Sequence, residues 1–263
     1  MIVIAILTLI AAAYLAAKRA APRPIYGRFH TAAFLGGCVT VAVALGSPLD
    51  EAAETRLSAH MIQHELLMVI AAPLLALGRA HWALLNLLAR RRRRIAAKLL
   101  RFGRWNPLLA CILHGVPVWI WHVPGLYQLA LAHPLLHATE HVSFLGTALL
   151  FWWSVLDRSA AYGLAALYVF ATSLHTSILG ALLFFSPRFW YPAYGLGASA
   201  LEDQQLAGLI MWIPAGFVLA ATALLLISHW LSETERRMTA RERLTSLKPN
   251  SREALAVAKG GRR

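Results

Sequence analysis

The sequence has little charge and almost no cysteine. Asp, Glu, Lys and Arg together make up 14% of its 263 residues, whereas hydrophobic residues make up 59%. Because the mean hydropathy is also positive, there is too little polar surface to cover a soluble globule of this length. The two cysteines, Cys38 and Cys111, lie singly in apolar runs without a C-x-x-C spacing. The composition therefore excludes a thiolate metal pair and a disulfide framework, and it predicts an integral membrane protein.

Acidic residues are particularly scarce: 12 against 25 basic residues, for a formal net charge of +13. Such a charge can indicate nucleic-acid binding. Here, however, the basic residues form blocks between apolar segments and do not follow one amphipathic or aromatic-interleaved face. We expect them to meet membrane lipid, and we expect no nucleic-acid partner.

Long apolar stretches recur along the chain. Seven are long enough to cross about 30 Å of hydrocarbon, so we expect an all-α, polytopic bundle of seven transmembrane helices within residues 1–231. The first is followed by Lys18 and Arg19 and not preceded by positive charge, which favours a retained helix over a cleaved signal. The expected spans are 2–17, 29–46, 59–77, 107–122, 138–156, 161–185 and 205–228.

The basic residues predict the orientation of these spans. One set of alternating connections contains four Lys or Arg at 18–28, nine at 79–104, one at Arg158 and nine after residue 231, whereas the other contains only Arg56 and Arg188. Cytoplasmic loops carry the excess of Lys and Arg. The N-terminus is therefore expected outside and the C-terminus in the cytoplasm.

Two cytoplasmic segments differ from the spans. Residues 79–104 mix leucines with five consecutive arginines, which is typical of a helix lying on an anionic leaflet. Residues 232–263 form a basic tail, expected to be a charged helical extension that becomes disordered toward its end.

Eleven histidines are present, and several are expected near the outer membrane surface. His60 and His64, like His137 and His141, are four residues apart, so each pair lies on one face of a helix. His122 ends the fourth span at the same surface. Acidic residues are also expected at the outer ends of the spans, namely Glu140, Glu202 and Asp203. This concentration of imidazole and carboxylate predicts a site for copper, zinc or iron.

Two further histidines, His114 and His175, are expected near the membrane midplane. Ionisable groups are costly there and often functional, although a neutral histidine that forms a hydrogen bond between helices is an equally good interpretation. If they act as axial ligands, the protein binds haem and serves electron transfer or haem handling. This haem hypothesis is our first alternative.

The segment "HATEH", residues 137–141, also satisfies the H-x-x-E-H pattern of inverted zinc proteases. A protease would use Glu140 as general base and would need a carboxylate ligand from elsewhere. Because the pattern has only three fixed letters, this is a third hypothesis. The aromatic segment "FWYPAYG", residues 189–195, is expected in an outer loop at the headgroup level, where it would cap the site or contact a partner.

Five motifs together resemble the seven-helix CtaG family of bacterial cytochrome c oxidase assembly factors. They are "HMIQHELL", "WIWHVPGLY", "HATEHVSF", "LHTSILGALL" and "LEDQQLAGLIMW". The resemblance covers about residues 25–230. The positions that match the family are His60, His64, His122, His137, Glu140, His141, His175, Glu202 and Asp203.

The resemblance implies a non-enzymatic protein of the bacterial inner membrane that is needed to make an active haem-copper oxidase of the respiratory chain. It implies copper as the metal, the matching residues as its ligands, and the oxidase subunits as partners. A metallochaperone of this kind would also meet a periplasmic or extracellular copper donor.

Overall fold

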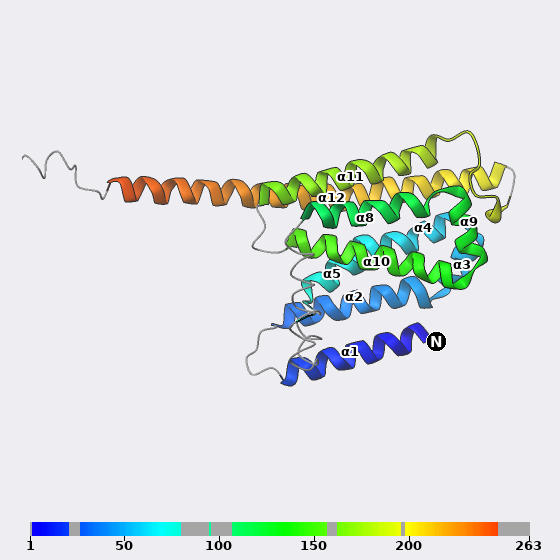
Figure 1. The fold of residues 1–263 in the computed structure, drawn as a ribbon, viewed down its shortest axis with the longest axis horizontal. Helices are drawn as coiled ribbons and strands as arrows, with labels where there is room; N and C mark the ends of the chain where they lie inside the picture. Colours follow the sequence, from blue (N-terminus) through cyan, green and yellow to red (C-terminus); the bar gives the residue numbers. More distant parts are fainter. Residues whose placement is uncertain are drawn as a thin grey trace, which may run out of the picture.

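The structure, a computed structural model, describes residues 2–20, 27–79, 95, 107–156, 162–195 and 198–246. Within these residues all regular secondary structure is helical (Figure 1). The helices are α1 (Ile2–Ala20), α2 (Arg28–Gly46), α3 (Pro48–Thr55), α4 (Leu57–Glu65), a π-helical segment (Leu66–Ala71), α5 (Ala72–Leu77), α8 (Pro107–Trp121), α9 (Pro124–Ala132), α10 (Pro134–Leu156), α11 (Tyr162–Phe185), a 3-10 turn (Pro192–Tyr194) and α12 (Ala198–Ser246).

Several of the described helices are candidate membrane spans. Four are long and apolar enough to span a membrane: α2, the continuous run from Leu57 to Leu77, α11 and the apolar part of α12. A fifth is obtained if α8 and α9, which are bent by 79° relative to each other, count as one broken span. Each of the seven expected stretches overlaps a described helix. The number seven and the orientation remain predictions, because α1 and α10 do not meet the same criterion among the described residues.

Two short helices were not predicted from the sequence, and two predicted segments lie outside the described residues. Helices α3 and α9 were not expected; each begins with a proline, a residue favoured in the first turn, and each is too short to span a membrane. The expected basic connection at 79–104 lies outside the described residues apart from Arg79 and Ile95. The end of the tail, residues 247–263, also lies outside them.

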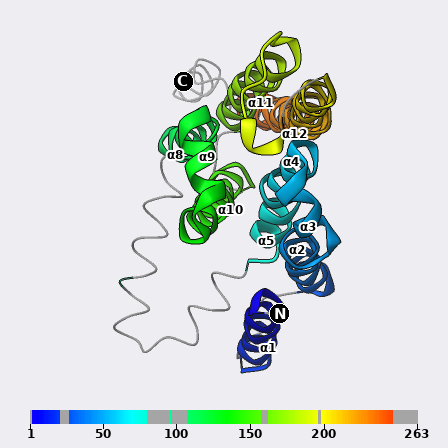
Figure 2. The ribbon, with the colours of Figure 1, turned by 90° about the vertical axis from the view of Figure 1, so that its right-hand side faces the viewer.

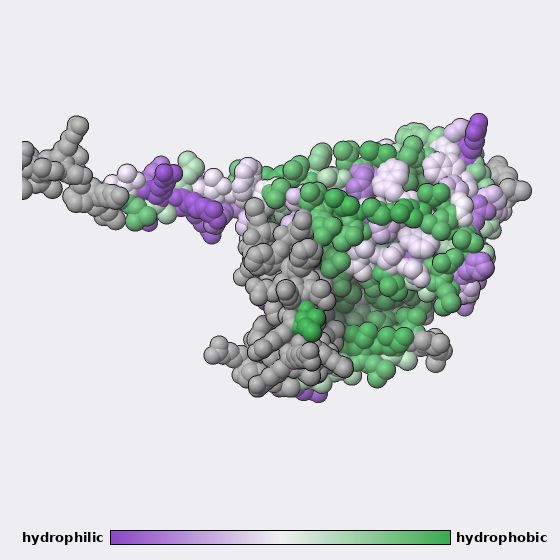
Figure 3. Space-filling model, viewed as in Figure 1, coloured by the Kyte–Doolittle hydropathy of each residue, from purple (hydrophilic) through white to green (hydrophobic). Residues whose placement is uncertain are grey.

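Apolar side chains cover the outside of the bundle, where a soluble protein would be polar. Leu9, Phe217 and Leu224 are examples of large apolar residues that are more than half exposed, and Figure 3 shows hydrophobic surface along the helices. Such a surface is stable in contact with lipid tails. The protein is therefore a membrane protein.

Helix α12 extends beyond the bundle (Figure 1), and a view along the bundle shows it beside α11 (Figure 2). Its 49 residues, at about 1.5 Å each, give a length of roughly 73 Å, more than twice the thickness of the hydrocarbon core. The projecting part has hydrophilic surface mixed with a few apolar side chains (Figure 3), and it contains an exposed Arg237–Glu233 ion pair. The apolar part of α12 packs along α11, where glycines allow close backbone contact: a Cβ added to Gly208 would lie 2.6 Å from the carbonyl oxygen of Gly180.

The π-helical segment precedes a proline and depends on a neighbouring helix. The Ala72 N–H donates to the carbonyl of Leu67 five residues earlier. In the same pattern the Met68 carbonyl would accept from residue 73, but Pro73 has no N–H. Instead the indole N–H of Trp152, on α10, donates to the Met68 carbonyl at 2.9 Å. This hydrogen bond joins α10 to the run from Leu57 to Leu77, and these are the two segments that contain the histidine pairs.

Candidate metal centre

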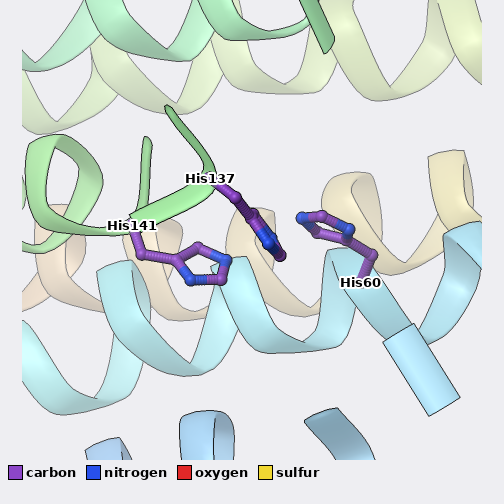
Figure 4. A group of neighbouring side chains, drawn as sticks. All are labelled: His60, His137 and His141. Atoms are coloured by element: carbon purple, nitrogen blue, oxygen red, sulfur yellow. The ribbon is translucent and has the colours of Figure 1, made fainter. Parts of the chain in front are cut away.

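Two helices bring the histidine pairs of the sequence face to face. His60 and His64 lie one turn apart on α4, and His137 and His141 lie one turn apart on α10. The ring centroids of His60 and His137 are 5.1 Å apart, and those of His64 and His141 are 5.4 Å apart. Figure 4 shows His60, His137 and His141 directed toward one another. The four imidazoles therefore form one cluster across the α4–α10 interface.

A fifth imidazole, His122, comes from the turn between α8 and α9. Its ring centroid is 6.1 Å from that of His64. The Nδ1 atom lies 2.6 Å from the carbonyl oxygen of Val118, so Nδ1 must carry the proton and donate it. The other nitrogen, Nε2, is buried without a hydrogen-bond partner. This tautomer leaves a lone pair on Nε2, which is the arrangement that metal-binding histidines adopt.

Glu140 supplies the carboxylate of the cluster. Its Oε1 atom lies 3.6 Å from Nε2 of His64, and both side chains are almost completely buried. Neither carboxylate oxygen has a hydrogen-bond partner. A buried, ionised carboxylate is costly unless a positive charge or hydrogen bonds compensate it. A bound metal cation would supply that charge.

Two groups of three residues place their ligand atoms within 4.8 Å of one another. One group consists of His60, His137 and His141, and the other of His60, His64 and Glu140. Nitrogen ligands at about 2.0 Å from one metal lie roughly 3 to 4 Å apart. Modest side-chain rotations would therefore complete coordination in either group. Imidazole with carboxylate suits copper, zinc and iron.

Hydroxyl groups of three tyrosines surround the cluster. The Tyr194 hydroxyl lies 2.7 Å from Nδ1 of His60 and 3.0 Å from the Tyr127 hydroxyl. The Tyr191 hydroxyl donates to the backbone carbonyl of His122 at 2.8 Å. Burial raises the pKa of Tyr191 and Tyr194, so both hydroxyls are protonated at neutral pH. No role for these tyrosines was predicted from the sequence, although Tyr191 and Tyr194 lie in the aromatic segment 189–195 and Tyr127 ends the motif WIWHVPGLY.

Two acidic candidates lie outside the cluster. Asp203 accepts hydrogen bonds from the backbone N–H of Ser58, at 3.3 Å, and from its side-chain hydroxyl. The carboxylate therefore satisfies the first turn of α4, where helix N–H groups lack intrahelical partners. Glu202 is exposed on α12. Neither residue belongs to the two ligand groups found among the described residues.

The two histidines expected near the midplane, His114 and His175, do not belong to either ligand group among the described residues. His114 is buried on α8, with its Nδ1 atom 3.4 Å from the Thr147 hydroxyl. His175, on α11, lies against α8: a Cβ added to Gly115 would be 3.5 Å from its Nε2 atom. A haem between axial histidines needs its porphyrin ring inserted between the two imidazoles. Helices α8 and α11 would have to separate for this, so their packing gives the haem hypothesis no support.

The chain was compared with protein families, with curated proteins and with solved structures. A family model described as cytochrome c oxidase caa3 assembly factor (Caa3_CtaG) matches residues 10–233. No curated protein and no solved structure matched. The matched range includes the helices and turns that contribute to the histidine cluster.

Proposed function

The chain belongs to the family of cytochrome c oxidase caa3 assembly factors, and we propose that it assists assembly by binding copper at its histidine cluster and delivering it to a haem-copper oxidase. The observation that carries the proposal is the convergence of five imidazoles and one carboxylate, with unpaired buried nitrogens and oxygens. Unsatisfied polar groups at this density are costly without a ligand. A metal ion would satisfy them together.

The proposal includes a location. The chain spans the bacterial inner membrane seven times, with its N-terminus outside and its C-terminus in the cytoplasm, as the Lys and Arg distribution favours. The cluster then lies at the outer surface. There it accepts copper from a periplasmic or extracellular donor and passes it to oxidase subunits within the membrane.

The site suits a carrier better than a permanent metal centre. It offers more ligands than one copper ion requires, so an incoming partner can replace them one at a time. The role needs no chemical transformation of a substrate, and we therefore assign no catalytic residue. Copper is the cargo that the protein transfers.

The zinc-protease hypothesis has less support from the same residues. Its pattern requires a further carboxylate ligand, whereas the residue that joins His137 and His141 is His60, a third imidazole. His60 and Glu140 are also almost completely buried. A peptide would need access to both the metal and the general base.

Metal analysis of the purified protein tests the proposal. We expect wild-type protein in detergent, loaded with copper and passed over a desalting column, to retain about one copper ion per chain. Replacing both His60 and His64 with alanine should abolish retention, because His60 belongs to both groups and His64 to the second. In cells, the same double variant should leave the oxidase deficient in copper.

The matched control is His133→Ala, because His133 is exposed at the end of α9 and outside the cluster. This variant should retain copper like wild type. A wild-type protein that binds no copper, or a double variant that retains it, would contradict the proposal.

A further inference from the structure

The two ligand groups of the cluster share one residue, His60, and differ in the rest. The first group adds His137 and His141, so all of its ligands are imidazoles. The second adds His64 and Glu140, so it contains a carboxylate. We call the first the imidazole position and the second the carboxylate position. His137 is only partly buried, whereas His64 and Glu140 are about 1% exposed. The carboxylate position is therefore the more enclosed of the two.

His60 can serve only one ion at a time. Its Nδ1 atom is hydrogen-bonded to the Tyr194 hydroxyl at 2.7 Å. Its Nε2 atom lies 2.9 Å from Nε2 of His64. A neutral imidazole has one lone pair for a metal, and in the tautomer in which Nδ1–H donates to the Tyr194 hydroxyl this lone pair is on Nε2. Two ions, one in each position, would compete for this nitrogen.

The two positions differ in charge and in the oxidation state that they favour. Three neutral imidazoles add no charge to the ion, whereas Glu140 adds one negative charge in a buried setting. Carboxylate oxygen is a hard ligand and stabilises the more highly charged ion. In a medium of low dielectric constant this charge interaction is strong. Cu(II) therefore gains more from the carboxylate position than Cu(I) does.

We propose that the cluster holds a single copper ion in either of two adjacent positions that share His60, with Cu(I) in the imidazole position and Cu(II) in the carboxylate position. The inference rests on the proposed copper-binding function and adds the number of ions and their ligands. The two positions are one turn apart along α4 and α10, and an ion enters one or the other according to its oxidation state on arrival; no oxidation or reduction at the cluster is proposed.

Affinity measurements on single variants of the full chain test this inference. Cu(I) affinity is measured anaerobically against a chromophoric chelator, and Cu(II) affinity against a second chelator. Glu140→Gln should weaken Cu(II) binding by about tenfold or more and change Cu(I) binding by less than about threefold. His137→Ala should weaken Cu(I) binding by about tenfold or more and change Cu(II) binding by less than about threefold. If His137→Ala does not fold, His137→Asn removes the imidazole while keeping a polar side chain.

The matched controls are Glu202→Gln and His133→Ala, which alter exposed residues of the same types outside the cluster. Both should bind either ion like wild type. The electron paramagnetic resonance spectrum of the Cu(II) form should be the same in His137→Ala as in wild type, and it should differ in Glu140→Gln, which loses the oxygen ligand.

The outcomes separate this inference from the proposed function. The inference is supported if the protein binds one ion per chain, Glu140→Gln weakens mainly Cu(II) binding, and His137→Ala weakens mainly Cu(I) binding. Two ions per chain, or equal weakening of both oxidation states by each variant, would overturn the inference and leave copper binding intact. A wild-type protein without copper would overturn the proposed function itself.

Discussion

At the scale of single residues, Tyr194 is the side chain that orients His60. The Tyr194 hydroxyl is hydrogen-bonded to Nδ1 of His60 and is itself fixed by the Tyr127 hydroxyl. Partners of this kind set the tautomer and the ring orientation of a metal ligand, and their loss commonly lowers metal affinity by about 10- to 100-fold. Under the proposed copper binding, Tyr194 is therefore a positioning residue for His60.

We expect Tyr194→Phe to lower copper affinity by about tenfold or more while the fold is retained, because only one hydroxyl is removed. A chelator competition assay measures the affinity, and thermal unfolding reports the fold. Tyr168→Phe removes a hydroxyl from α11, away from the cluster, and should leave the affinity unchanged. Equal affinities of Tyr194→Phe and wild type would show that His60 needs no such support.

At the scale of helices, the hydrogen bond from Trp152 to the Met68 carbonyl compensates for Pro73. Both Trp152 and Met68 are buried, so this carbonyl would otherwise have no donor. The contact lies about one turn beyond His64, in the π-helical continuation of α4, and it helps to fix how this continuous helix lies against α10. The face-to-face arrangement of the histidine pairs depends on that packing.

Trp152→Phe should destabilise the protein by about 1–3 kcal/mol, because it leaves a buried carbonyl without a donor and trims a packed side chain. Thermal or denaturant unfolding in detergent measures the change. Adding Pro73→Ala should recover part of the loss, because residue 73 then has an N–H for the Met68 carbonyl. If the changes in unfolding free energy caused by Trp152→Phe and Pro73→Ala are additive in the double variant, this explanation of the π-helical segment is wrong.

At the scale of the whole molecule, the basic residues predict how the chain lies in the membrane. Nine of them fall at 79–104 and nine after residue 231, whereas Arg188 lies alone between α11 and α12. If the positive-inside rule holds here, the projecting end of α12 reaches into the cytoplasm and the 186–195 loop lies outside. The histidine cluster, which contacts Tyr194 of that loop, then also lies at the outer surface.

Reporter fusions test this orientation. A fluorescent protein fused to the C-terminus should fluoresce, and alkaline phosphatase fused there should be inactive, because the enzyme needs the oxidising periplasm. Alkaline phosphatase fused after Arg188 should be active. Active phosphatase at the C-terminus would reverse the orientation and put the cluster at the cytoplasmic surface.

Much of this protein could be predicted from local patterns. Apolar stretches placed the helices, because hydrocarbon requires apolar side chains and internally paired backbone groups over a fixed length. The spacing of four put His60 beside His64 and His137 beside His141, because residues four apart share one face of a helix. The motifs also indicated the family that the family model matches.

The tertiary structure decided which of these elements meet. It brought the two histidine pairs and His122 together, placed Tyr194 against His60, and engaged Asp203 with Ser58 and not with the cluster. Spacing fixes the face of one helix but not the neighbour that this face contacts. That choice depends on packing contacts such as Gly208 against Gly180 and Trp152 against Met68, which form between segments far apart in the chain. Hydropathy and residue spacing do not predict contacts between distant segments. The sequence by itself therefore determined the helices and the types of candidate ligand, and helix packing determined which of these residues meet.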